Sequence, residues 1–134
     1  MTEPAFALER AMLTALRGAV PPVAGGRIFD VVPPGAAFPY VELGDAQVVP
    51  DPAEGLERSV EVYVILHTWS RKPGRPEGRK LCGQIVDILT GLDLDLGASL
   101  ALALLTHDGT RHLTEADGLT YHGVVTFRAL IDPA

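Results

Sequence analysis

The sequence contains little cysteine and no long apolar run. Its single cysteine, Cys82, excludes an internal disulfide framework and a zinc site built from several cysteines, and it fits synthesis in a reducing cytoplasm. The longest apolar run, residues 100–105, is too short to span a bilayer, and the first residues lack the basic segment of a signal peptide. We therefore expect a protein that is made in the cytoplasm and has no membrane partner.

Basic residues are also in the minority. Eleven Lys and Arg stand against 17 Asp and Glu, and the resulting net charge of −6 argues against a general nucleic-acid-binding protein, which needs a basic surface. The 134 residues fit one domain, 1–134, that is large enough to bury its own core. Hydrophobic residues make up 47% of the chain, with a mean hydropathy of +0.21, so we expect part of the apolar surface to contact other subunits.

The charges are unevenly distributed along the chain. Residues 42–61 hold six acids and one base, whereas residues 71–80 hold five bases and one acid. The basic segment is either a solvated loop or a contact for an acidic partner or a passing DNA strand. The acidic segment could be that partner surface on the next subunit, or an inner wall that repels phosphate. The bases of the second segment are Arg71, Lys72, Arg75, Arg79 and Lys80.

No group of residues has the spacing of a catalytic, cofactor or metal site. The four histidines do not follow a helical metal-ligand spacing, and Cys82 has the apolar neighbours of a core cysteine. Residues 74–80 resemble a phosphate-binding loop, but their glycines are too close together, Pro76 removes an amide, and Leu81 replaces the required Ser or Thr. We therefore predict a protein that is not an enzyme and that has no cofactor and no metal.

Periodicity and turn residues predict two helices and several strands. A helix is expected over 4–16, where apolar residues recur at helical spacing, and another over 76–92. Strands are expected over 27–31, 40–43, 59–70, 100–105 and 119–131, with an exposed loop over 44–58 and a turn at Asp108-Gly109. This order predicts an α+β fold, an antiparallel β-sheet of about four to five strands with two helices packed on it.

The strand predicted over 59–70 has two apolar faces. Val62, Val64 and Leu66 lie on one, while Tyr63 and Trp69 lie on the other. Helices can cover only one face in the predicted plan, so the second face is expected to be covered partly by a neighbouring subunit. The aromatic residues near 38–40 and at 69 fit either a small core or such a subunit contact.

Four segments together resemble one protein family. They are GRIFD at 26–30, FPYV at 38–41, LHTWSR at 66–71 and DGLTYHGVVTFR at 117–128. In this order and spacing the chain resembles the tail terminator, or tail-completion, proteins of long-tailed phages, prophages and gene transfer agents. That resemblance implies a homo-hexameric ring that caps the tail tube, ends its growth and joins the tail to the head connector, leaving a channel through which DNA passes without sequence-specific binding.

The implied partners are other copies of the chain, the tail tube protein and the head-side stopper or connector protein. The implied location is the head-tail junction of the particle. Two alternatives stay open, the stopper protein of the same particle and a small ligand-binding α+β domain. The residues predicted to form interfaces are Phe38, Tyr40, Tyr63, His67, Trp69, Arg71, Lys72, Arg75, Arg79 and Lys80.

Overall fold

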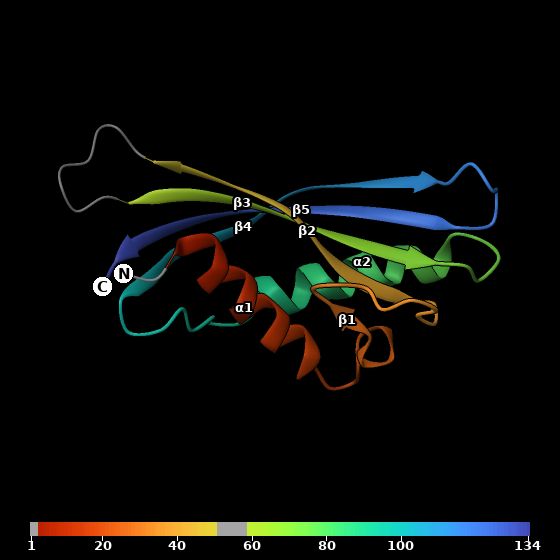
Figure 1. The fold of residues 1–134 in the computed structure, drawn as a ribbon, viewed down its shortest axis with the longest axis horizontal. Coiled ribbons are helices and arrows are strands. Elements are labelled where there is room, and N and C mark those ends of the chain that lie inside the picture. Colours follow the sequence, from red (N-terminus) through yellow and green to blue (C-terminus); the bar gives the residue numbers. More distant parts are fainter. Residues whose placement is uncertain (1–2, 51–58) are drawn as a thin grey trace.

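A five-stranded sheet with two helices on one of its faces makes up the fold (Figure 1). The computed structural model describes residues 3–50 and 59–134. The elements in chain order are α1 (Pro4–Arg17), the short 3-10 helix η1 (Ala24–Gly26), β1 (Ile28–Phe29), β2 (Tyr40–Pro50), β3 (Val60–Ser70), α2 (Pro76–Thr90), β4 (Leu100–Thr114) and β5 (Tyr121–Pro133). This arrangement confirms the predicted α+β fold with two helices.

The strands are ordered β1-β2-β3-β5-β4. Three of the four pairings are antiparallel, and the two-residue strand β1 pairs with β2 in parallel. The crossover from β3 through α2 to β4 leaves β5 between them, so β4 forms one edge of the sheet. The sheet is therefore mixed, and it is mostly antiparallel as predicted.

Local sequence explains where the helices begin. Pro4 and Pro76 each occupy the first helical position, where the missing amide hydrogen costs no hydrogen bond. The Glu3 carboxylate accepts hydrogen bonds from the amides of Ala5 and Phe6 and caps α1. The N-cap of α2 is Arg75, whose side chain makes no capping bond. Among the described residues, no helix is long and apolar enough to cross a membrane.

The core lies between the two helices and the sheet. The side chains of Val62, Val64 and Leu66 on β3 are fully buried, which confirms the face predicted for this strand. Phe127 on β5 is the largest of the fully buried side chains. Burial of such apolar groups stabilises the fold by about 1.5–3 kcal/mol for each large side chain.

Two predictions about loops are wrong. Residues 44–50 belong to β2, which pairs with β3 from Tyr40↔Trp69 to Pro50↔Val60 across an irregularity between Leu43 and Ala46. The glycine and the acids suggested a loop, but long-range pairing overrides such local preferences. The remainder of the predicted loop, 51–58, lies outside the described residues.

The predicted turn at Asp108-Gly109 is also wrong, because β4 continues through it. The strand absorbs the extra residue as an irregularity between His107 and Gly109, and a second one lies between Leu102 and Leu104. The second irregularity breaks the predicted alternation and leaves Leu104 43% exposed. The chain turns instead at 115–120, where the Gly118 amide donates to the Glu115 carbonyl at 3.0 Å.

Candidate interaction surfaces on the sheet and on helix α2

In the part of the chain that the structure describes, no helix covers the face of the sheet opposite α1 and α2 (Figure 1). Along β3, every second residue from Glu61 to Trp69 is only half-buried, while the residues between them lie in the core. The cross-strand register places Tyr40, Trp69 and His122 side by side on this face. We call this surface the open sheet face.

An aromatic stack occupies one end of the open sheet face. The Trp69 ring stacks on the His122 ring with centroids 3.9 Å apart, and Tyr40 lies on the other side of Trp69 at 6.4 Å. The Trp69 indole N–H donates to a Glu42 carboxylate oxygen at 3.0 Å. Phe38 extends the stack beyond Tyr40, with centroids 5.2 Å apart. The predicted aromatic residues therefore lie together, on the surface and not in the core.

Two histidines and a carboxylate form a hydrogen-bonded chain beside the stack. His67 Nδ1 lies 2.7 Å from His122 Nε2, and His122 Nδ1 lies 2.9 Å from Glu115 Oε1. With an ionised carboxylate, His122 donates through Nδ1 to Glu115, and its Nε2 accepts from His67 Nδ1–H. Burial, and then the electrostatic effect of the neighbouring His122, holds the pKa of His67 below its ordinary value.

Arg71 follows the end of β3 and contacts residues of the 115–120 turn. Its guanidinium lies over the Phe38 ring at 4.4 Å, and its Nε donates to the Thr120 hydroxyl at 3.0 Å. The Asp117 carboxylate, 3.9 Å from Arg71, accepts from the amides of Leu119 and Thr120. These backbone hydrogen bonds, more than Arg71, hold the pKa of Asp117 below its ordinary value.

At the opposite end of the open sheet face, the Glu61 carboxylate accepts hydrogen bonds from two side chains. Arg128 Nε donates to Glu61 Oε2 at 2.8 Å, and the Tyr63 hydroxyl donates to the same oxygen at 3.0 Å. The hydrogen bond from Arg128 is the main reason that the pKa of Glu61 lies below its ordinary value. Tyr63 is therefore on the open sheet face as predicted, but it bonds to the Glu61–Arg128 ion pair and is not part of the aromatic stack.

The predicted interface residues separate into two groups. Phe38, Tyr40, Tyr63, His67, Trp69 and Arg71 lie on or beside the open sheet face. The basic residues Lys72, Arg75, Arg79 and Lys80 are exposed and lie on or just before α2, which packs on the other face of the sheet. The structure therefore does not bring the two groups into one site.

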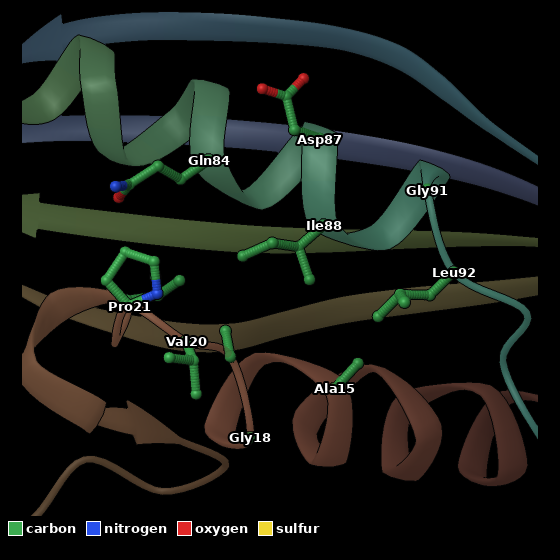
Figure 2. Close-up of a pocket in the computed structure, with 11 residues that line it drawn as sticks. Ala15, Gly18, Val20, Pro21, Gln84, Asp87, Ile88, Gly91 and Leu92 are labelled. Atoms are coloured by element: carbon green, nitrogen blue, oxygen red, sulfur yellow. The ribbon is translucent and has the colours of Figure 1, made fainter.

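A groove between α1 and α2 is a surface that the sequence does not predict. It measures about 490 Å³ and is lined by residues of both helices and of the segment that follows α1 (Figure 2). Ile88 and Leu92 point from α2 toward α1, and Val20 faces them from the connecting segment. Val20 is 94% exposed and Leu92 is 52% exposed. Leu92 lies beyond the end of α2 at Thr90, although the helix predicted over 76–92 includes it.

Sequence reasoning also misses the roles of His122, Glu42 and Glu115. His122 lies directly opposite Trp69 in the register of β3 and β5, and Glu42 lies opposite His67. Only the strand alignment reveals these neighbours, because the residues are far apart in the sequence. The alternation along 119–131 does place His122 on the correct face, and that was the available signal.

Cys82 occupies the environment of a structural cysteine. Its side chain is buried, its sulfur lies 3.4 Å from the Thr68 hydroxyl, and burial raises the pKa of the thiol. A raised pKa keeps the thiol protonated, which is unfavourable for a nucleophile. Within residues 3–50 and 59–134, no group of three His, Cys, Asp or Glu side chains has the geometry to hold a metal ion.

Both the sequence and the fold of this chain are similar to those of known proteins. Residues 10–132 match the profile of the family described as tail completion protein gp17. Two solved structures share the fold. A chain of the virion of the native gene transfer agent (GTA) particle is 22% identical, with a TM-score of 0.85 and 96% coverage of both chains. The gp17 protein of bacteriophage SPP1 is 21% identical, with a TM-score of 0.62, 94% coverage of this chain and 89% of that one. No curated protein matches the sequence.

Proposed function

The chain belongs to the tail completion protein gp17 family, and on that premise we propose that it forms a homo-hexameric ring that caps the tail tube. Membership makes the protein a structural component of a phage-type particle and not an enzyme. In the proposed ring, the cap ends growth of the tube and supplies the surface to which the head connector joins. The ring acts at the head-tail junction.

The main structural support for this proposal is the open sheet face. It holds a preformed stack of Tyr40, Trp69 and His122, whose rings are half-buried within a single copy of the chain. Aromatic side chains that are fixed in place and lack an apolar cover are typical of residues that dominate protein interfaces. We assign this face to contact with another protein subunit of the particle.

Ring closure needs two different surfaces on each copy. A head-to-tail contact repeats around the ring when one patch of each copy fits a different patch of the next. The open sheet face and the helical face with its groove lie on opposite sides of the molecule, so each copy offers more than one surface to its partners. One rim of the ring would bind the tail tube protein, and the other would bind the head-side stopper.

A closed ring leaves a central channel for DNA. The net charge of −6 disfavours adhesion of the passing phosphate backbone, so the DNA would move through without sequence-specific binding. The rims of the ring therefore need surfaces that are complementary to the protein partners, whereas the channel needs a surface that attracts DNA only weakly.

The mass of the purified protein in solution, with negative-stain imaging in the presence and absence of tail tubes, tests the proposal. A mass six times that of one chain, or rings on one end of each tube, is expected. A protein that stays monomeric and never associates with tubes would overturn the ring. Rings that bind the head connector but not the tube would favour the stopper alternative.

A further inference from the structure

Apart from Glu77 in its first turn, helix α2 carries its charges in the order that its dipole disfavours. Arg75 and Arg79 lie at its amino-terminal end, whereas Asp87 lies in its last turn and Asp93 follows it. All four side chains are exposed, and none takes part in an ion pair within the described residues. Each such placement destabilises the helix, because the amino-terminal end carries a partial positive charge and the carboxyl-terminal end a partial negative one. An arrangement that weakens the isolated helix suggests that both ends have partners outside the chain.

The acidic end of α2 borders the apolar groove. Asp87 lines the groove at its outer edge, with its carboxylate pointing from α2 away from α1, and Leu92 contributes to the apolar floor (Figure 2). Asp93 and Asp95 line the adjoining depression, together with Leu92 and Arg10. The guanidinium of Arg10 lies over the Phe6 ring at 5.5 Å, and Arg10 forms no ion pair with either aspartate in the part of the chain described. The groove thus combines an apolar floor with an acidic border.

The basic end of α2 supplies a segment with matching chemistry. Residues 71–76, with the sequence RKPGRP, contain three bases and two prolines, and all six are exposed. Arg71 contacts Phe38 and Thr120 of its own copy, so Lys72 and Arg75 are the bases available to a partner. Prolines present apolar rings on a stiff backbone, so little conformational entropy is lost when such a segment docks. The rings suit the apolar floor, and the bases suit the acidic border.

A copy of the chain cannot place this segment in its own groove. The segment and the acidic border lie at opposite ends of α2, and a helix of 15 residues is about 22 Å long. We propose that the groove between α1 and α2 receives residues 71–76 of a second copy of the chain. This inference rests on the proposed ring, and it names the two surfaces that meet between neighbours. It places α2 along the circumference of the ring.

Other acids of the chain are weaker candidates for this contact. Glu42 accepts a hydrogen bond from Trp69, and Glu61 pairs with Arg128, so both are engaged within one copy. The open sheet face can therefore contact a different partner while the groove and the segment 71–76 join neighbouring copies.

Two charge-reversal variants of the full chain test the contact. The groove variant is Asp87→Lys with Asp93→Lys, and the segment variant is Lys72→Glu with Arg75→Glu. Each should raise the concentration at half assembly by about tenfold or more, because like charges then face each other. Asp30→Lys with Asp108→Lys changes the net charge by the same amount as the groove variant at exposed positions elsewhere, and should assemble normally.

Combining the reversals separates this contact from a general charge effect. A chain with all four changes should regain rings, because its groove and its segment again carry opposite charges. The groove variant and the segment variant should each fail to form rings alone, whereas an equimolar mixture should form rings in which they alternate, because the basic groove of one then meets the acidic segment of the other, and its basic segment meets the other's acidic groove. Circular dichroism would verify that each variant is folded.

The possible failures are distinguishable. Normal rings from both variants would overturn the contact and leave the proposed ring intact. Rings that form but no longer cap tubes would assign the groove to the tail tube protein instead, and loss of DNA binding alone would assign the segment to DNA. If the unmodified protein forms no rings, a disulfide between Leu92→Cys on one copy and Gly74→Cys on another would still support the contact, and its absence would overturn it.

Discussion

Trp69 stacks on His122 with ring centroids 3.9 Å apart and ring planes 10° apart. The two residues come from neighbouring strands, and each is fixed by a carboxylate: Glu42 accepts from the Trp69 indole, and Glu115 bonds to His122. The stack therefore keeps its shape without a partner. A surface that is already ordered loses less conformational entropy on association.

Replacing Trp69 with alanine should weaken assembly more than it weakens folding. The indole lies at the centre of the proposed contact, and truncation of such a residue costs about 2 kcal/mol or more of binding free energy. Within the fold it loses the stacking with His122, worth about 0.5–1.5 kcal/mol. Ring formation and tube capping, measured beside urea unfolding, would separate the two effects.

Phe6→Ala is the matched control for Trp69→Ala. Phe6 is also an exposed aromatic residue, but it lies on α1 and not on the open sheet face. It should leave assembly unchanged. If Trp69→Ala assembles as well as the Phe6 variant, the open sheet face is not a contact surface.

Stability should fall as the pH falls below the ordinary pKa of histidine. Burial and the neighbouring His122 keep the pKa of His67 below its ordinary value of 6.5 in the folded protein, so the unfolded chain binds more protons in this range. The contribution is therefore fully present above pH 6.5 and is lost as the pH falls from 6.5 through the folded pKa. Urea unfolding of the monomeric fold between pH 8 and pH 5.5 would measure this slope.

His67→Gln should reduce the slope without removing it. Gln can still donate to His122 but does not titrate, while His112 retains a pKa lowered by burial and by Arg79. Carboxylates with lowered pKa values, such as those of Glu61 and Asp117, titrate below this pH range. Equal slopes for the variant and the unmodified protein would remove His67 from the explanation.

The sequence was sufficient to predict the two helices, the α+β class and the buried face of β3, because each has a clear periodicity over many residues. It was insufficient where distant pairing decides the structure. Residues 44–50 begin with a glycine and an aspartate and end with a proline, yet β3 supplies the partner that makes them a strand. At Asp108-Gly109, β5 keeps β4 extended through a local turn signal.

The candidate surfaces could likewise be predicted from the sequence only in part. Alternation along the chain predicts that Tyr63, His67 and Trp69 share one face, but only the register brings His122 and Glu42 beside them. The groove depends on how α1 and α2 pack, and no single segment encodes that geometry. Leu92 has the helical spacing of a core residue, but the helix ends at Thr90 and leaves it exposed.

Cys82 should react with thiol reagents only when the protein opens. The side chain is 3% exposed, and burial raises the pKa of its thiol, so both access and thiolate content are low. The rate of modification should rise steeply at the urea concentration that unfolds the chain. A Cys82→Ser chain with Arg75→Cys is the exposed control, which should react in the folded state. Rapid modification of native Cys82 would contradict the packing of α2 on the sheet.

Gly123→Ala should destabilise the fold, because α2 and β3 approach β5 closely at this glycine. A Cβ at position 123 would lie 2.5 Å from the Cys82 sulfur and closer still to the Thr68 hydroxyl, both of which are buried. Overpacking of this kind typically costs about 1–3 kcal/mol. Gly83→Ala, one residue beyond Cys82, has nothing within 4 Å of the new Cβ and should be neutral or stabilise α2 by up to about 1 kcal/mol. In urea unfolding, Gly123→Ala should lower the free energy of unfolding, and Gly83→Ala should leave it unchanged or raise it. Equal changes in the two variants would show that α2 packs less closely on β5 than the structure indicates.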